Sequence, residues 1–347
     1  MKINIDVTVV GSGPSGSAVA KYCAEKGLNV IIIEKKKQAG FPSHCAGYVS
    51  KLVARYFSVP KACIQQSIEK MRTYLPSGCY TTAKMRGWIV ERSIFDKSLC
   101  IQALEEGASI LINSEAIELK ESELIVKERG KNKIIRINPR YIVGADGATS
   151  RVAKWIGIKQ RRFANCAQYE IAGVSIETPE IAETYFSMEY APRCYAWIYP
   201  TSKTTAKVGV GVIGKNPFIY LNTFMKSIEK LKNAKVFAIY KGLVPLSGMH
   251  EKIYERNILL VGDAAGVTDP ITGAGILSGI ITGKLAARAI AEENVERYQD
   301  MVNKVLGKRL QRSLEKRKIF DEIKSDEELE KMLPKLWVTF KDFWADH

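Results

Sequence analysis

The most regular pattern of apolar and polar positions lies at the start of the chain. Residues 3–10 predict a buried strand, residues 11–16 a tight glycine-rich turn, residues 17–26 a helix and residues 28–34 a second buried strand. A strand, a helix and a second strand in this order form a βαβ unit with parallel strands. The amino-terminal part of the chain is therefore expected to belong to an α/β domain.

The next hundred residues mix loops with short elements. Glycine, proline and serine among polar residues predict a long loop at 35–50, followed by a short helical pattern at 51–57. Helical periodicity returns at 93–107. Three short strand patterns separated by polar turns follow at 109–143. We expect them to form a small meander inserted in the first domain.

The second half of the chain changes character twice. Residues 168–212 are rich in aromatic and β-branched side chains and have few helical patterns, which predicts a second, antiparallel lobe. A third buried strand at 258–261 then precedes a glycine-rich turn and a helix at 275–292. Because this strand returns late in the chain, we expect the nucleotide-binding domain to be discontinuous. Residues after 294 are helical in pattern and strongly charged.

The fold class expected from these elements is α/β. A Rossmann-type, discontinuous nucleotide-binding domain is joined to an antiparallel-sheet substrate domain and to carboxyl-terminal helices. The expected boundaries are 1–60, 85–165 and 245–295 for the nucleotide-binding domain, 61–84 and 166–244 for the substrate domain, and 296–347 for the helical segment.

The glycine-rich turn has the sequence GSGPSG at residues 11–16. Glycines between a strand and a helix let the backbone approach a pyrophosphate at the helix amino terminus. The second strand ends in Glu34, 18 residues after Gly16, where a carboxylate can accept hydrogen bonds from an adenosine ribose. The strand, turn, helix, strand and acid together predict a dinucleotide site.

Three later motifs resemble those of glutathione-reductase-type flavoproteins related to the aromatic hydroxylases. They are RSIFD at 92–96, GADGATSR at 144–151 and GDAAG at 262–266. The resemblance implies FAD as the cofactor, and it implies that a helix amino terminus near 275 lies at the flavin ring, where it stabilises negative charge. The FAD-contacting residues expected from the turn, the acid and these motifs are Gly11, Gly13, Ser15, Gly16, Glu34, Arg92, Asp146, Asp263, Gly275 and Ile276.

Two further segments resemble the geranylgeranyl reductase family. They are FPSHCAG at 41–47, which matches a cysteine- and glycine-rich loop after the second strand, and YAWIYP at 195–200, which matches a YxWxFP segment lining an isoprenoid tunnel. Ala46 stands where glycine is usual, and Tyr199 replaces the usual phenylalanine. By this resemblance Cys45 lies beside the flavin, and Ala46, Gly47 and Ala116 add backbone contacts to FAD.

The implied reaction saturates C=C bonds of geranylgeranyl or other isoprenoid chains, in archaeal-type ether-lipid biosynthesis or another prenyl pathway. Such a step needs a hydride from reduced flavin, a proton and a dry pocket. Cys45 is the candidate proton donor, with an inert buried thiol as the alternative. Tyr195, Trp197 and Tyr199 alternate along a strand and share one face, which can line an apolar substrate tunnel or simply pack a core.

Two other functions remain open at the level of sequence. A flavin-dependent monooxygenase or halogenase shares the fold, and some halogenases have a WxWxIP segment similar to residues 195–200. A prenyl-lipid carrier that retains FAD without redox activity is the non-enzymatic alternative. Only one GxGxxG turn is present, so the electron donor to FAD, whether NADPH, ferredoxin or another reductant, stays open.

Composition narrows the partners and the compartment. The 52 Lys and Arg residues exceed the 37 Asp and Glu residues, for a formal charge of +15. The basic residues are spread along the chain without a nucleic-acid motif, so we expect anionic lipid or dinucleotide rather than nucleic acid. The 7 cysteines contain no CxxC pair, which predicts neither a disulfide framework nor a metal site and fits a reducing cytoplasm.

Membrane contact, if any, is expected to be peripheral. Neither a secretory signal nor a run of 18 apolar residues is visible in the sequence. The segment LPKLWVTFKDFW at 333–344 places aromatic residues and lysines at roughly helical spacing. Such a segment can lie in a membrane interface, but docking on its own protein is the commoner use, and we favour docking.

Overall fold

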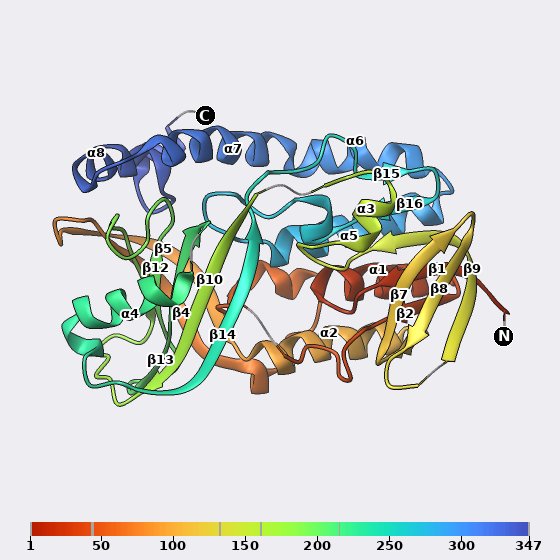
Figure 1. Cartoon of the computed structure of the whole chain (residues 1–347), viewed down its shortest axis with the longest axis horizontal. Helices are drawn as coiled ribbons and strands as arrows, with labels where there is room; N and C mark the ends of the chain where they lie inside the picture. Colours follow the sequence, from red (N-terminus) through yellow and green to blue (C-terminus); the bar gives the residue numbers. More distant parts are fainter. Residues whose placement is uncertain (1, 43–44, 132, 160–161, 215, 346–347) are drawn as a thin grey trace.

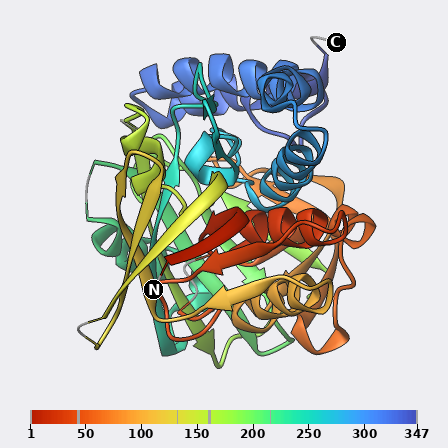
Figure 2. The same cartoon turned by 90° about the vertical axis from the view of Figure 1, so that its right-hand side faces the viewer.

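A computed structural model describes residues 2–42, 45–131, 133–159, 162–214 and 216–345. Two sheets form two lobes, and helices of the carboxyl-terminal part run along one side of both lobes (Figure 1). In the perpendicular view these helices lie at the top, above the strands of the amino-terminal lobe (Figure 2). The expected α/β class is confirmed, with one lobe built on parallel strands and the other on antiparallel strands.

The first sheet is a Rossmann-type sheet. Parallel pairing joins the neighbouring strands of its main path except at β15, which is an antiparallel edge, and a hairpin joins β9 by antiparallel pairing. A parallel strand that is covered on both faces is apolar throughout, as the fully buried β2 shows. The strands in order are β15 (Tyr254–Glu255), β16 (Ile258–Leu260), β9 (Lys133–Gly144), β1 (Lys2–Val10), β2 (Val30–Ile33) and β6 (Ser109–Leu111).

The expected meander at 109–143 is only partly separate from this sheet. β7 (Ser114–Lys120) and β8 (Glu123–Glu128) form a hairpin, and β8 pairs with the first half of β9. The second half of β9 lies between β1 and β16, and β6 pairs with β2. One long strand therefore serves both the hairpin and the parallel sheet, which the polar turn pattern could not reveal.

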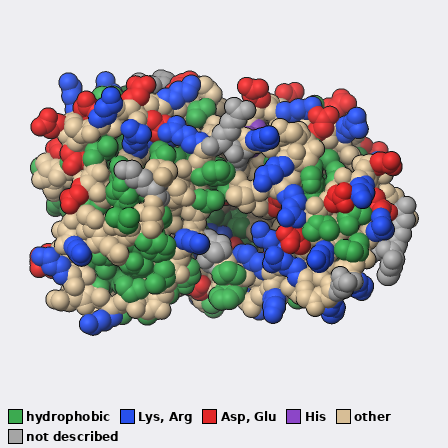
Figure 3. Space-filling view, in the orientation of Figure 1, with side chains coloured by type: hydrophobic (Ala, Val, Ile, Leu, Met, Phe, Trp, Pro, Cys, Tyr) green, Lys and Arg blue, Asp and Glu red, His purple; other side chains and the backbone are tan. Residues whose placement is uncertain are grey.

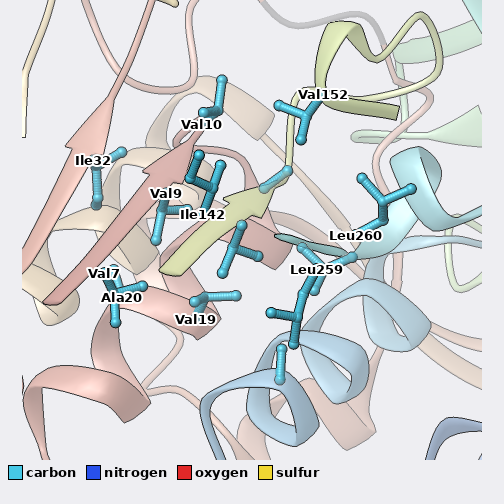
Figure 4. Close-up of a cluster of buried hydrophobic side chains, with 14 of the residues drawn as sticks. Val7, Val9, Val10, Val19, Ala20, Ile32, Ile142, Val152, Leu259 and Leu260 are labelled. Carbon is cyan, nitrogen blue, oxygen red and sulfur yellow. The ribbon is translucent and has the colours of Figure 1, made fainter. Parts of the chain in front are cut away.

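Three helices cover the first sheet close to the glycine-rich turn. They are α1 (Pro14–Ala24), α2 (Arg92–Glu105) and α5 (Ile276–Ala291). α1 and α5 approach closely because Gly283 lacks a Cβ, which would otherwise lie 2.6 Å from the carbonyl oxygen of Ser15. The side chains beneath them form one apolar cluster, with Val9, Ile142 and Leu260 among its members (Figure 4). α1 starts three residues earlier than expected, since proline at a first helical position is favourable.

The second sheet is antiparallel except where β11 pairs with β4. A helix, α4 (Pro217–Ser227), packs on one of its faces. The strands in order are β14 (Lys235–Pro245), β10 (Phe163–Ala172), β13 (Thr205–Ile213), β12 (Ala196–Pro200), β11 (Ile181–Tyr185), β4 (Ile64–Tyr74), β5 (Tyr80–Val90) and β3 (Tyr48–Ser50).

Two strands cross the domain boundaries expected from sequence. β4 and β5 form one antiparallel hairpin, so all of β5 belongs to the second sheet, although the expected boundary falls at residue 85. β3 lies within the range 1–60 but pairs with β5. The chain therefore enters the second lobe at residue 48, and the loop at 35–50 connects the two lobes instead of staying in the first.

The carboxyl-terminal helices are α6 (Tyr298–Val302), α7 (Lys308–Glu322) and α8 (Asp326–Leu336). α6 and the start of α7 pack on the first lobe, while the end of α7 and α8 close the other face of the second sheet. Phe320, Leu333, Leu336 and Trp337 are buried in the same apolar cluster as Trp197 of β12. Docking of the segment 333–344 on its own protein is thus confirmed for these side chains.

Candidate functional site

The glycine-rich turn has the geometry of a dinucleotide site. Gly11 has a φ of +106°, and a Cβ there would lie 2.5 Å from the carbonyl oxygen of Ala145. A Cβ on Gly16 would lie far inside van der Waals contact of the Gly11 carbonyl oxygen. A side chain at either position is therefore excluded by backbone of the protein itself. These two glycines permit the tight passage from β1 into α1.

Gly13 has a different role, because a Cβ there would meet nothing within 4 Å. It is the N-cap of α1, and that helix has neither a side-chain cap nor an acidic residue in its first turn. Unpaired backbone N–H groups at such an end attract an anion. Ser15 follows in the first turn and packs against Gly262 of the later GDAAG motif. The open space at Gly13 fits the pyrophosphate of FAD.

Glu34 is buried directly after β2, and its carboxylate forms hydrogen bonds with the glycine-rich turn. One carboxylate oxygen accepts hydrogen bonds from the backbone N–H and the hydroxyl of Ser12, at 2.9 and 2.6 Å. The other accepts from the backbone N–H of Lys36 at 2.8 Å. Each carboxylate oxygen has two lone pairs, so the oxygen that binds the Lys36 N–H retains capacity for a ribose hydroxyl. Ala116 lies on β7, two residues after Ser114, whose N–H binds the Glu34 carbonyl oxygen.

Asp146 is committed to its own turn. Its carboxylate accepts from the Ser150 hydroxyl at 2.5 Å and from the backbone N–H of Arg151 at 2.6 Å. These bonds cap α3 (Arg151–Trp155) and fix the turn beside Gly11, since Ala145 donates to the Val10 carbonyl oxygen. A contribution of Asp146 to FAD through the shape of this turn stays a prediction.

The late glycine-rich segment forms a second anion cradle. α5 begins at Ile276 with Gly275 as an N-cap that has no side-chain hydrogen bond, and its first turn lacks acidic residues. A Cβ on Gly275 would lie 2.8 Å from the Thr268 hydroxyl and 3.0 Å from the Asp263 carboxylate. Burial raises the pKa of Asp263, while the Thr268 hydroxyl and the Arg92 charge oppose this shift. The uncapped end of α5 fits the flavin ring of FAD.

Arg92 connects this cradle to the cysteine loop. Its guanidinium donates to both carboxylate oxygens of Asp96, at 2.9 and 2.8 Å. Burial lowers the pKa of Arg92, but Asp96 and then Cys45 act in the opposite direction and hold it above its ordinary value. Arg92 therefore faces Cys45 and Asp263 as a permanent cation, which the RSIFD motif alone did not reveal.

The described part of the cysteine loop turns sharply around Gly47, while Ser43 and His44 lie outside the described residues. The Cys45 sulfur accepts from the Gly47 N–H at 3.5 Å. Gly47 has a φ of +84°, and a Cβ there would lie 2.6 Å from the Val90 carbonyl oxygen. Ala46, at the position where glycine is usual, packs against the aromatic cluster of the second sheet. The loop thus presents a half-buried thiol to Arg92.

The structure brings the three candidate substrate aromatics together in one row. Ring centroids of Tyr195 and Trp197 are 5.9 Å apart, and those of Trp197 and Tyr199 are 6.1 Å apart. The Tyr195 hydroxyl donates to the Thr272 carbonyl oxygen at 2.7 Å, in the segment that leads into α5. The ring centroids of Tyr199 and Tyr48 are 5.6 Å apart, and Tyr48 directly follows Gly47 in the sequence. The row therefore joins the flavin cradle to the cysteine loop.

Sequence reasoning missed three residues of this face. Gln168 accepts from the Trp197 indole N–H at 3.2 Å, Trp337 packs against Tyr195 with centroids 4.8 Å apart, and Lys207 is buried near Gly47. Gln168 has no signal in a single sequence. Trp337 lies in the aromatic segment 333–344, but the sequence did not show that it packs against Tyr195. Lys207 had one, since a lysine within the apolar run 206–213 is unusual in a strand interior.

Trp337 should be a main support of the aromatic row. Its ring is 2% exposed, and its indole N–H donates to the Thr73 hydroxyl at 3.0 Å. We expect Trp337→Ala to lower the free energy of unfolding by about 3–5 kcal/mol, through lost apolar contact and a cavity. Urea denaturation at a fixed FAD concentration measures the change, with the more conservative Trp337→Phe as the control. An unchanged midpoint for Trp337→Ala would contradict this packing.

Comparison with known proteins shows the family of the chain. A family model described as the geranylgeranyl reductase catalytic domain matches residues 163–244, and one described as an NAD(P)-binding Rossmann-like domain matches residues 9–66. The digeranylgeranylglycerophospholipid reductase of Methanosarcina acetivorans is 38% identical over 315 residues, covering 84% of this chain and 76% of that protein. The enzyme of the same name from Methanocaldococcus jannaschii is 33% identical, with 93% and 88% covered.

Solved structures give the same grouping. A geranylgeranyl bacteriochlorophyll reductase-like protein from Thermoplasma acidophilum superposes with a TM-score of 0.90 at 27% identity, covering 97% of this chain and 92% of that one. The flavin-dependent brominase Bmp2 superposes with a TM-score of 0.70 at 21% identity, covering 86% and 84%. At that identity the brominase shares the fold, and no chemistry follows from it.

Proposed function

The chain belongs to the geranylgeranyl reductase family, and from this premise we propose that it hydrogenates the isolated C=C bonds of geranylgeranyl chains in ether lipids. Two relatives named digeranylgeranylglycerophospholipid reductase match this chain over 76% and 88% of their own length. The cofactor is FAD, which the uncapped ends of α1 and α5 and the open space at Gly13 accommodate. The enzyme is therefore an FAD-dependent oxidoreductase that acts on an apolar chain.

One observation carries the proposal. The row formed by Tyr195, Trp197 and Tyr199 connects the segment before α5 with the Cys45 loop. An isoprenoid chain that lies along this row passes the flavin cradle and reaches the Cys45 thiol. A polar substrate would gain nothing from such a surface.

The residues of the site divide the chemistry between them. When bound and reduced, FAD supplies the hydride. Cys45 donates its S–H proton to the neighbouring alkene carbon, so that one hydride and one proton add across each double bond. Arg92 lies against the sulfur and stabilises the thiolate that remains. The aromatic row excludes water and holds the alkene in place.

A halogenase or monooxygenase is the competing reaction class. Such enzymes consume oxygen at the reduced flavin, whereas the proposed reductase transfers hydride to the lipid directly. Under nitrogen, mixing dithionite-reduced holoprotein with digeranylgeranylglycerophospholipid should restore the absorbance of oxidised flavin, and the fully saturated lipid should not. Flavin that stays reduced under nitrogen but yields hydroxylated or halogenated products in air would overturn the reductase. Flavin that dithionite cannot reduce, with tight lipid binding, would indicate a carrier.

We further propose that the protein meets its lipid at the cytoplasmic surface of a membrane. The described residues include no helix that is both long and apolar enough to cross a bilayer. β14 is an edge strand that pairs only with β10, and Phe237 and Ile239 on it are 62% and 64% exposed. Lys235 and Lys241 lie on the same strand. Hydrophobic side chains gather over this region in the space-filling view (Figure 3).

Apolar side chains framed by lysines suit an anionic bilayer surface. We expect Phe237→Ser combined with Ile239→Ser to reduce co-sedimentation with anionic vesicles roughly tenfold or more, because each exposed ring or chain loses its burial in lipid. Ile112→Ser, at an exposed apolar residue of the first lobe, is the control. Equal vesicle binding by the double variant, or a wild-type dimer that the double variant no longer forms, would contradict a membrane role for β14.

A further inference from the structure

Lys207 is buried in the face of the second sheet that carries the aromatic row. It is 2% exposed and lies between buried Ala206 and Val208 on β13. Two residues further along the strand, Gly209 lies directly under the Trp197 ring. Burial of a lysine is costly unless partners compensate the charge. A buried ammonium in this position therefore suggests a functional role.

The Lys207 ammonium is located at the back of the Cys45 loop. It donates to the Val90 carbonyl oxygen at 2.9 Å, next to the Gly47 turn. It lies 3.3 Å from the point where a Cβ on Gly47 would stand, and the Gly47 N–H binds the Cys45 sulfur. Gly47 therefore lies between the two groups: its N–H binds the Cys45 sulfur, and the Lys207 ammonium lies on its other side.

Two carboxylates accompany the ammonium. Lys207 lies 3.8 Å from a Glu170 oxygen and 4.0 Å from a Glu91 oxygen. Burial lowers the pKa of Lys207, while Glu170, Glu91 and Cys45 oppose this and Arg92 adds to it. Burial also raises the pKa of Glu170, with Lys207 and a hydrogen bond from Tyr240 opposing. Burial therefore moves the pKa values of Lys207 and Glu170 toward each other.

The two cations that face Cys45 differ in what they can do. A guanidinium keeps its proton at any ordinary pH, but an ammonium with a lowered pKa can release one. Arg92 can hold a thiolate and cannot reprotonate it. The other titratable groups that face Cys45 are Tyr199 and Cys166, and burial raises the pKa of both. Lys207 is thus the better source of a proton on this side of the loop.

We propose that Lys207 is a positioning residue that returns a proton to Cys45 after each reduction, and that Glu170 restores the proton of Lys207 from solvent. The inference rests on Cys45 as the proton donor of the proposed function. In the balanced sequence the S–H bond breaks as a C–H bond forms, an N–H proton of Lys207 then moves to the thiolate, and the amine takes a proton from Glu170. The Glu170 side chain is 13% exposed, so water can reprotonate it.

Lys207→Arg separates charge from proton release. The arginine keeps a cation at the loop but cannot give up its proton. In reduced holoprotein under nitrogen we expect the first reduced double bond per enzyme to form within about threefold of the wild-type rate, because the first reduction uses the proton that the proposed function assigns to Cys45 itself. Steady-state turnover should fall roughly tenfold or more. Glu170→Gln should show the same split, and Lys230→Met, which removes a lysine paired with Glu183 elsewhere on the second lobe, should show none.

A second readout needs no lipid turnover. Alkylation of Cys45 by iodoacetamide at neutral pH, followed at the peptide level, reports how much thiolate is present. We expect Lys207→Met to slow it at least about twofold and Lys207→Arg to leave it close to wild type, since only the first loses the cation beside the loop. FAD content verifies that each variant is folded.

The outcomes separate this inference from the function on which it rests. Equal Cys45 alkylation in wild type and Lys207→Met, or wild-type steady-state turnover in Lys207→Arg, would overturn the role of Lys207. A wild-type protein that reduces no lipid even in its first turnover would overturn the proposed function. The alkylation comparison would in that case still decide whether Lys207 acts on Cys45.

Discussion

Replacing Cys45 with serine is expected to slow lipid reduction roughly 100-fold or more while leaving FAD bound. A serine hydroxyl fills nearly the same space but is a far weaker acid than a thiol, so proton transfer to the alkene carbon fails. The Arg92 guanidinium that faces the Cys45 sulfur would remain paired with Asp96. The measurement is lipid turnover per flavin with dithionite as the reductant, which makes the result independent of the natural electron donor.

The chain offers matched controls for this variant. Cys79 is exposed in the turn between β4 and β5, and Cys63 is buried away from the aromatic row. Cys79→Ser and Cys63→Ser should reduce lipid at nearly the wild-type rate. Wild-type turnover by Cys45→Ser would contradict a chemical role for the thiol and leave it as a packing residue of the loop.

The second large effect concerns the glycine-rich turn, where two alanine variants should fail for different reasons. Gly13→Ala places its methyl group in space that no protein atom occupies, so the protein should fold normally and bind FAD at least about tenfold more weakly. Gly16→Ala places its methyl group against the Gly11 carbonyl oxygen, so the backbone itself must move. We expect that change to destabilise the apoprotein by about 3 kcal/mol or more.

Flavin titration of purified apoprotein and urea denaturation without FAD measure the two effects separately. The pair is informative because both changes add one methyl group within three residues of each other. Wild-type FAD affinity in Gly13→Ala would show that the cofactor phosphates do not approach the turn at this point. Equal apoprotein stability in Gly16→Ala would contradict the close contact between the turn and α1.

The first lobe was predictable because its signals are local. The run of β2, the glycines and Glu34 all lie within 34 residues, and each element follows from its own composition. The late strand β16 and helix α5 were also evident from their patterns, although only the structure shows β16 beside β9. The sequence located the cofactor turn. It did not show that the Glu34 carboxylate binds Ser12, or that Asp146 accepts from the backbone N–H of Arg151 at the start of α3.

The second lobe was harder to predict because its strands form by long-range pairing. β4 and β5 carry many polar and charged residues, since one side of each lies near the surface, and they lack the apolar runs of the first sheet. β14 is similar, with its exposed lysines and apolar residues in alternation. Helix α4 was not expected within the lobe at all. Packing against neighbouring strands decides such elements more than local preference does.

The candidate site shows the same division. Cys45 and the aromatic row were identified through resemblance to a family, and their roles in catalysis and substrate binding stay predictions. Arg92 was expected to contact FAD, and its place against Cys45 became visible only when α2 and the loop were seen together. Lys207 shows that the role of a buried charge depends on neighbours from other segments, here residues 90–91 and Glu170.

The most direct test of the account is the mass of the lipid after one anaerobic turnover. Holoprotein reduced with dithionite is mixed with digeranylgeranylglycerophospholipid, and the lipid is extracted and analysed by mass spectrometry alongside a sample with Cys45→Ser. The account predicts that the lipid gains the mass of two hydrogen atoms for each reduced bond in the wild-type sample, and that this gain is almost absent in the variant. An unchanged lipid mass in the wild-type sample, although FAD is bound and reduced, would contradict the central claim.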